Sequence, residues 1–92
     1  FAEVFETAVR MFPDDTIANL NAANAAMRRG DLTAAKRYLA KTDYSPEAVY
    51  ARGALAIRQK DYDSARRYLN EAKSLGSEQA GITLEQLEKG KH

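Results

Sequence analysis

The residues from Pro46 to Ser77, PEAVYARGALAIRQKDYDSARRYLNEAKSLGS, decide the fold of this 92-residue chain. They read as two helices joined by a turn at Lys60-Asp61. Small residues, Gly53 and Ala65 among them, stand where the two helices have to touch, because backbones at a close crossing leave no space for large side chains. The segment therefore predicts a helix-turn-helix hairpin.

The preceding segment repeats this pattern at an offset of 30 residues, with eight identities in the 27 pairs that begin with Thr16. Ala23 stands in the place of Gly53, and Asn19 stands in the place of Val49. The identical pairs are Ala18/Ala48, Ala26/Ala56, Arg28/Arg58, Asp31/Asp61, Ala35/Ala65, Arg37/Arg67, Tyr38/Tyr68 and Leu39/Leu69. The chain therefore contains an internal repeat.

Polar residues mark the predicted helix starts. Ser45 offers a hydroxyl cap, and Pro46 suits the first helical position. Four further residues are predicted to cap helices: Asp15, Asp31, Asp61 and Ser77. The second helix of the earlier repeat is expected to be about one turn short, at roughly 3.6 residues per turn, and Tyr44 is expected to fill the gap that this leaves.

One more helix is predicted on each flank. The first has apolar residues at the spacing of a single helix face: Phe1, Phe5, Ala8 and Phe12. Pro13 ends that helix. The last helix, in residues 78–89, also has one apolar face: Ala80, Leu84 and Leu87.

The pattern of residues 46–77 resembles one tetratricopeptide repeat, whose period is about 34 residues. The positions that carry the resemblance are Val49, Gly53, Ala65, Leu69 and Ala72, with Asp61-Tyr62 in the turn. The departures from the pattern are Arg52, Ala56 and the missing closing proline at Gly76-Ser77. The resemblance implies an all-α fold in which antiparallel helix-turn-helix repeats stack in a short right-handed α-solenoid of about six helices.

Under this resemblance the chain has four parts and about two and a half repeats. Residues 1–13 are expected to be the second helix of a truncated preceding repeat, and residues 16–45 a repeat with a shortened second helix. Residues 46–77 form the next repeat, and residues 78–89 a C-terminal capping helix. Such a cap needs a polar outer face, because each repeat exposes an apolar surface to the next one.

In this family the first helices of successive repeats line a concave groove that holds a peptide or protein segment. The resemblance therefore implies a non-catalytic protein-protein interaction module whose groove is formed by these residues: Ile17, Leu20, Asn21, Asn24, Met27, Arg28, Tyr50, Ala54, Ile57 and Arg58. Packing against neighbouring helices is the alternative for the apolar members. Two other functions stay open: a structural end-domain of a larger multidomain protein, and self-association through an uncovered aromatic face of Phe1, Phe5 and Phe12.

Asn21 and Asn24 are the most suggestive polar pair, because an amide both donates to and accepts from a peptide backbone. The alternative is that they, together with Asn19, are solvated positions on a short helix. In the chaperone-binding branch of the family, cations stand where this chain has Leu20 and Glu47, so binding of chaperone tails is not expected.

The paired arginines Arg28 and Arg58 recur near the ends of equivalent helices. A cation at such a place interacts favourably with the helix dipole. The functional alternative is a pair of arginines at one lip of the groove that favours an acidic ligand.

Composition excludes several other classes of protein. The length leaves room for one small domain, and no run approaches the roughly 18 apolar residues of a membrane helix. The chain has no cysteine and one histidine, His92, so thiol nucleophiles, histidine triads and histidine metal sites have no support. We therefore expect no enzyme, no cofactor and no metal.

The expected partner is a protein or peptide. A formal net charge of +1 and the lack of a base-reading motif argue against nucleic acid. Arrays of this family are often attached to larger bacterial proteins, including envelope proteins, so cytoplasm and periplasm both stay open.

Overall fold

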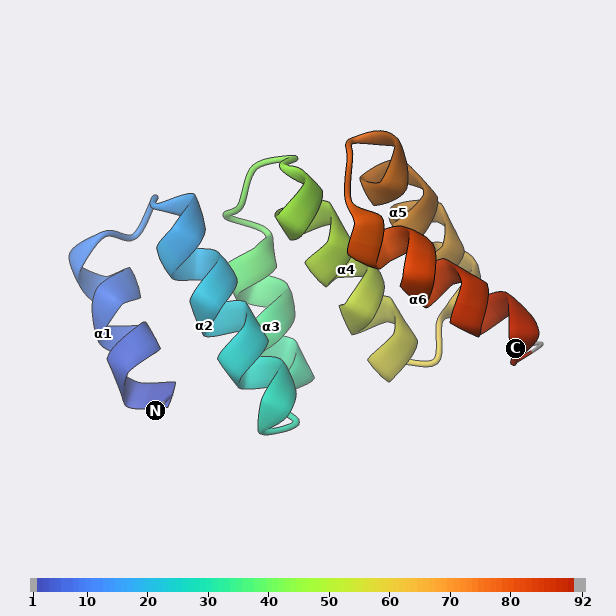
Figure 1. Cartoon of the computed structure of the whole chain (residues 1–92). Coiled ribbons are helices and arrows are strands. Elements are labelled where there is room, and N and C mark those ends of the chain that lie inside the picture. Colours follow the sequence, from blue (N-terminus) through green and yellow to red (C-terminus); the bar gives the residue numbers. More distant parts are fainter. Residues whose placement is uncertain (1, 91–92) are drawn as a thin grey trace. The chain divides into compact units, whose positions relative to one another are not determined.

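The computed structural model describes residues 2–90, with the side chains of residues 2–5 left out of the description. In this part of the chain the structure is all-helical, with six helices and no strand (Figure 1). The helices are α1 (Ala2–Met11), α2 (Thr16–Arg28), α3 (Leu32–Leu39), α4 (Pro46–Arg58), α5 (Tyr62–Ser74) and α6 (Glu78–Lys89). The expectation of an all-α chain of about six helices is confirmed.

The chain divides into two compact units rather than the single small domain expected from its length. Unit 1 spans Phe1–Asp43 and contains α1, α2 and α3, whereas unit 2 spans Tyr44–His92 and contains α4, α5 and α6. The division falls in the segment between α3, which has 8 residues, and α4. Because contacts in repeat proteins are made between neighbouring elements, such a chain does not need one shared core.

Unit 1 is organised around α2, which packs against both α1 and α3. The side chains at its crossing with α3 are small, and Ala23, Ala26 and Ala35 are fully buried. Alanine keeps high helix propensity while leaving little bulk between two backbones. The small residues of the internal repeat therefore serve the close packing of this pair.

Among the described side chains of unit 1, Asn19 is the buried polar residue. It is 0% exposed, and its Nδ2 donates to the carbonyl oxygens of Pro13 and Asp15, each at 2.9 Å. These bonds hold the first turn of α2 against the segment that follows α1. The alternative that Asn19 is a solvated position is therefore wrong. It occupies the place of Val49, which is equally buried in unit 2, and satisfies its amide N–H groups locally.

Unit 2 is organised around α5, which packs against both α4 and α6. Its core consists of Val49, Ala56, Ala65, Leu69, Ala72, Ala80 and Leu87. At Gly53 an added Cβ would come within 3.0 Å of Cγ and Cδ2 of Leu69, so glycine permits the close approach of α4 and α5. The sequence assigned Gly53 this role.

Local hydrogen bonds define the helix starts as the sequence predicts. The side chain of each expected cap accepts a backbone N–H three residues further on: Asp15 from Ala18 at 2.7 Å, Asp31 from Ala34 at 3.1 Å, Ser45 from Ala48 at 3.3 Å, Asp61 from Ser64 at 3.3 Å and Ser77 from Ala80 at 3.1 Å. All five predicted caps are confirmed. Each such cap contributes about 1 kcal/mol to helix stability.

Three helix ends share one turn, in which a residue with positive φ follows the last helical turn. These residues are Gly30 (φ 83°), Lys60 (φ 61°) and Gly76 (φ 109°). In each case the next backbone N–H donates to a carbonyl in the last turn, namely Asp31 to Ala26, Asp61 to Ala56 and Ser77 to Ala72, all at 2.9 Å. Lys60 is the non-glycine member, and a side chain in this conformation strains the backbone.

Candidate functional site

The candidate binding face of unit 1 lies on α2. Its members recur at three- and four-residue intervals, which places them on one side of the helix. We call them the α2 face: Ile17, Leu20, Asn21, Asn24 and Arg28. Ile17 is 69% exposed, Asn21 and Arg28 are exposed, and Leu20 and Asn24 are half-buried. The α2 face therefore offers both apolar and polar groups to solvent.

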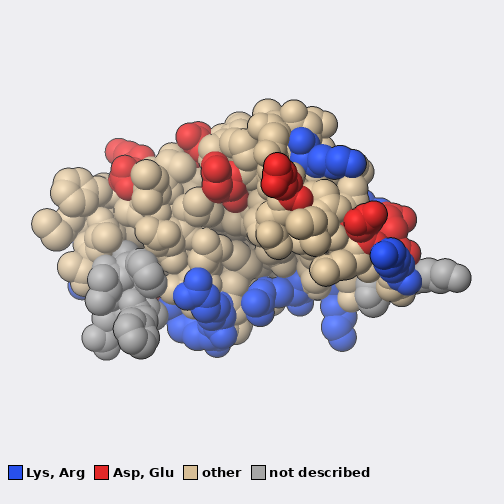
Figure 2. Space-filling model, viewed as in Figure 1, with Lys and Arg blue, Asp and Glu red and all other residues tan. Residues whose placement is uncertain are grey.

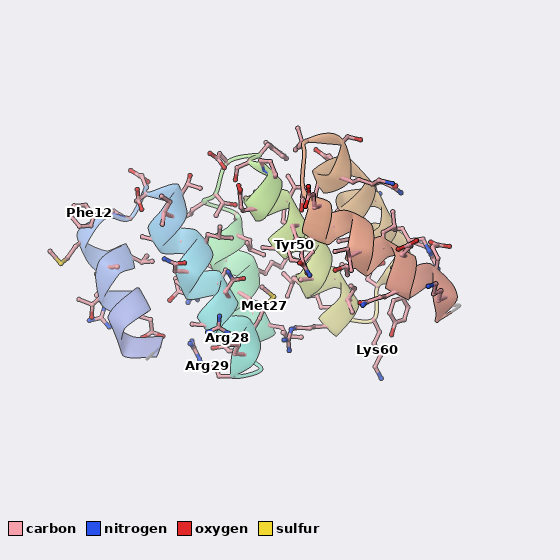
Figure 3. The ribbon with its side chains drawn as sticks, viewed as in Figure 1. Phe12, Met27, Arg28, Arg29, Tyr50 and Lys60 are labelled. Carbon is pink, nitrogen blue, oxygen red and sulfur yellow. The ribbon has the colours of Figure 1, made fainter. Side chains whose placement is uncertain are left out.

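The polar members of the α2 face have no partner within the described part of the chain. No hydrogen bond joins the side chain of Asn21 or Asn24 to another described residue, and no ion pair is formed there by Arg28. Arg29, by contrast, pairs with Glu6 at 3.2 Å and with Asp31 at 3.5 Å. Figure 3 shows Arg28 and Arg29 together at the end of α2. One arginine there is used structurally, whereas the other is available.

Met27 differs from the other predicted groove residues of α2. Its side chain is only 4% exposed and offers no surface to a ligand. We therefore leave Met27 out of the α2 face. An apolar stripe on one helix does not by itself distinguish a core position from a surface position.

Basic and acidic side chains lie toward opposite ends of two helices, α2 in unit 1 and α4 in unit 2. In unit 1, Asp14 and Asp15 precede α2, and Arg28 ends it. In unit 2, Glu47 lies in the first turn of α4, and Arg58 lies in its last turn. Figure 2 shows that both basic and acidic side chains reach the visible face. Acids near helix N-termini and cations near C-termini interact favourably with the helix dipole, so this pattern has a structural cause.

The predicted groove residues of unit 2 lie on α4. Tyr50, Ala54 and Ile57 are half-buried, and Arg58 is exposed. Tyr50 and Ile57 pack against the core of unit 2, and the Tyr50 hydroxyl lies 3.2 Å from Oγ1 of Thr83 in α6. These two side chains therefore pack within the unit and also reach its surface.

A hollow of about 320 Å³ opens between the three helices of unit 2. We call it the α4–α6 hollow, and its lining residues are Ile57, Tyr62, Thr83, Gln86 and Leu87. Of these, Ile57 alone is among the site residues that the sequence predicted. The others were missed because the last helix was interpreted only as a cap. The shared start of α4 and α6, Ser45 with buried Ala48 and Ser77 with buried Ala80, was the available signal that α6 resembles a further first helix.

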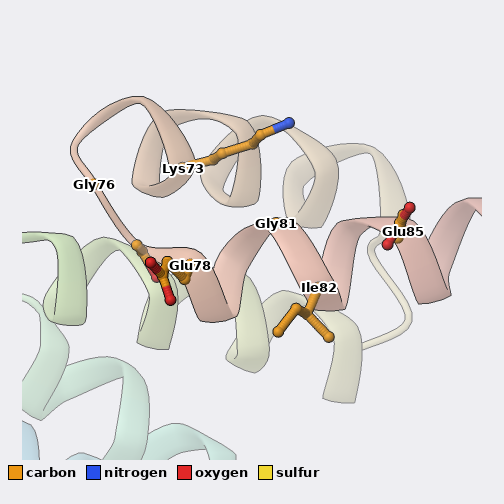
Figure 4. Close-up of a pocket in the computed structure, with 7 residues that line it drawn as sticks. Lys73, Gly76, Glu78, Gly81, Ile82 and Glu85 are labelled. Atoms are coloured by element: carbon orange, nitrogen blue, oxygen red, sulfur yellow. The ribbon is translucent and has the colours of Figure 1, made fainter.

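A second, wider hollow lies where α5 ends and α6 begins (Figure 4). It measures about 530 Å³, and its lining residues are Lys73, Gly76, Ser77, Glu78, Gly81, Ile82 and Glu85. Apart from Ser77 and Gly81, these residues are exposed. Because this hollow has no buried apolar wall, a ligand in it would contact less water-shielded apolar surface than a ligand in the α4–α6 hollow.

The expected aromatic face is described in part. Phe12 is 60% exposed, and neighbouring Met11 is 67% exposed. Phe1 and the side chain of Phe5 lie outside the described residues. Phe12 itself follows α1 rather than belonging to it, and Figure 3 shows its ring directed into solvent.

The sequence predicts that Tyr44 fills a gap in the packing, and this prediction is wrong. Its side chain is 70% exposed, and the guanidinium carbon of Arg52 lies 4.8 Å from the centre of its ring. A cation over an exposed tyrosine ring contributes about 0.5–1 kcal/mol, and the phenol hydroxyl stays hydrated. The ring therefore packs on α4 from outside and is not part of a core.

The described residues contain no group of histidine, cysteine, aspartate and glutamate side chains that could hold a metal ion. Among the helices described, none is long and apolar enough to cross a bilayer.

Comparison with known families identifies the class of protein. A tetratricopeptide repeat model matches residues 2–46 and, in a second placement, residues 33–80. With most of the chain matched and its helices arranged as helix-turn-helix pairs, this protein belongs to the tetratricopeptide repeat family. Searches of curated proteins and of solved structures give no match.

Proposed function

We propose that this chain is a non-catalytic module that binds a peptide or protein segment on the first helices of its repeats, α2 in unit 1 and α4 in unit 2. Tetratricopeptide repeats are in general protein-protein interaction modules, which supports the class of function. The observation that carries the proposal is the α2 face, where Asn21, Asn24 and Arg28 have no partner among the described residues and lie beside exposed Ile17. Such a mixture suits recognition of a peptide backbone and an adjoining acidic group.

The same proposal assigns the helices to repeats. In it, α1 is the second helix of a preceding repeat, α2 with α3 and α4 with α5 are two repeats, and α6 is the C-terminal capping helix. The 8 residues of α3 against the 13 of α5 support a shortened second helix in the earlier repeat.

The test of binding through α2 is affinity capture of a partner, followed by measurement of its affinity for variants. The double variant Asn24→Ala, Arg28→Glu is expected to lose about tenfold or more in affinity, since a charge-assisted contact and an amide contact are removed. Lys36→Glu, an exposed residue of α3, makes the same charge change as Arg28→Glu and is the matched control. Equal losses in both variants, or none in either, would refute binding through the α2 face.

Self-association is the second candidate, because Met11 and Phe12 expose two large apolar side chains side by side in the sequence. In this case the molar mass measured by light scattering rises with concentration, and Phe12→Asp removes the rise. Ile82→Asp, at another exposed apolar residue, is the control. A mass that stays monomeric at all concentrations excludes this candidate. A structural end-domain role is favoured instead if the captured partner is a longer form of this chain.

A further inference from the structure

The α4–α6 hollow has an apolar floor and a polar rim. Leu87 is buried beneath it, Ile57 and Tyr62 form half-buried walls, and Thr83 and exposed Gln86 supply polar groups. Its volume of about 320 Å³ lies at the lower end of the range of roughly 300–1,000 Å³ for small-molecule sites. A hollow of this size suits one large side chain of a peptide better than a nucleotide or other large cofactor.

Lys60 extends from the turn that joins two lining residues of this hollow, Ile57 and Tyr62. Its φ of 61° places it in the left-handed region, where the equivalent turns have Gly30 and Gly76. A lysine there destabilises the chain relative to glycine, and strained residues of this kind concentrate at functional sites. Lys60 forms no ion pair with any described residue, and Figure 3 shows its exposed side chain extending from this turn into solvent.

We infer that the α4–α6 hollow is a subsite for a peptide segment in which one large apolar residue is followed by an acidic residue. The inference rests on the proposed function and names the ligand class that unit 2 recognises. The apolar side chain packs against Ile57, Tyr62 and Leu87. The Gln86 amide bonds to the ligand backbone, and the Lys60 ammonium group meets the acidic side chain.

The test uses synthetic nonapeptides of glycine and serine with a central Leu-Asp pair, and control peptides with Leu-Lys, Leu-Ser or Ser-Asp. Amide chemical shifts of the ¹⁵N-labelled chain are followed during titration. The Leu-Asp peptide is expected to shift Thr83, Gln86 and Leu87 and to bind most tightly. The Ser-Asp peptide loses at least about tenfold, because a buried leucine contributes roughly 1.5–3 kcal/mol.

Substitutions in the protein test whether the peptide binds in the α4–α6 hollow. Gln86→Tyr blocks the rim and is expected to weaken Leu-Asp binding at least about tenfold, the loss expected when the leucine is excluded. Gln79→Tyr, two turns earlier on α6 and outside the hollow, leaves binding unchanged. Lys60→Gly lowers Leu-Asp affinity by about twofold to fivefold, the range of an exposed ion pair, and leaves Leu-Ser affinity unchanged.

Three results overturn the inference: no shifts in the hollow with the Leu-Asp peptide, equal or tighter binding of the Leu-Lys peptide, or unchanged binding to Gln86→Tyr. Partner capture separates this outcome from failure of the proposed function. A captured partner that depends on Arg28 but not on Gln86 leaves the proposed function standing without this subsite. Leu-Asp binding in the hollow without any dependence of capture on Arg28 leaves the subsite standing without the α2 face.

Discussion

Replacing Lys60 with glycine is expected to stabilise the protein, although it removes a side chain from a tight turn. The left-handed conformation costs a residue with a Cβ about 1–2 kcal/mol. Glycine removes this strain, but about 0.5–1 kcal/mol of the gain is offset because glycine has more conformational freedom in the unfolded chain. The net increase in the free energy of unfolding is therefore about 0.5–1 kcal/mol. The equivalent turn tests the converse: Gly30→Ala introduces no steric contact within 4 Å, so its expected loss of similar size comes from the backbone alone.

Urea unfolding followed by circular dichroism at 222 nm measures this difference. Gln59→Gly is the matched control, because Gln59 precedes Lys60 but has a φ of −84°, which any residue adopts. That control is expected to lose about 0.5–1 kcal/mol, since glycine gains freedom there without relief of strain. If Lys60→Gly and Gln59→Gly both destabilise the protein, Lys60 does not strain the turn, and its conformation then gives no reason to assign it to a functional site.

Three further changes test the packing and the caps. Gly53→Ala is expected to destabilise unit 2 by about 1 kcal/mol or more in the same urea assay, because its Cβ meets a fully buried leucine at 3.0 Å. The control Gly81→Ala, whose Cβ would lie at an ordinary 3.7 Å from the Lys73 side chain, is expected to gain about 0.5–1 kcal/mol from helix propensity. If Gly81→Ala is the less stable of the two variants, the close crossing of α4 and α5 is contradicted. Asn19→Ala removes two hydrogen bonds from a buried site and is expected to cost about 1–3 kcal/mol, whereas Asn21→Ala on the exposed side costs little; equal melting temperatures for the two variants would disprove the structural role of Asn19. The hydrogen bonds with Ser64 hold the pKa of Asp61 below its ordinary value of 3.8. This carboxylate therefore stabilises the fold above that pH, and the stabilisation is lost as the pH falls through the lower folded-state pKa. Asp61→Asn is expected to flatten the acid end of a plot of melting temperature against pH, and an unchanged plot would count against the cap.

The helices and their starts could be predicted from sequence because their causes are local. A serine or aspartate cap, as at Ser45 and Asp61, acts on an N–H group three residues away. Gly53 could likewise be assigned to a helix crossing, because a small residue at a fixed place in a helical repeat is what a close approach of two backbones requires.

The predictions that were wrong or incomplete concern residues whose burial depends on contacts with other segments, which the residue spacing of one helix does not reveal. Asn19 has a polar side chain and is nevertheless buried, because carbonyl oxygens of the preceding turn accept hydrogen bonds from its amide group. Tyr44 was expected to pack inward, but Arg52 provides a surface for its ring outside the core. Met27 has the spacing of a surface residue but is buried. The lining of the α4–α6 hollow requires three helices to meet, which residue spacing along one helix does not reveal.

Site-specific photo-crosslinking tests most directly whether the first helices bind a partner. A photoreactive amino acid is placed at Asn21 or Arg28 on the α2 face, at Ala54 on α4, or at Lys36 on α3 as the control, and the protein is irradiated in a native lysate. We expect adducts with another protein from the α2 and α4 positions and not from Lys36. Adducts from Lys36 alone, or from all positions equally, would contradict binding through the first helices.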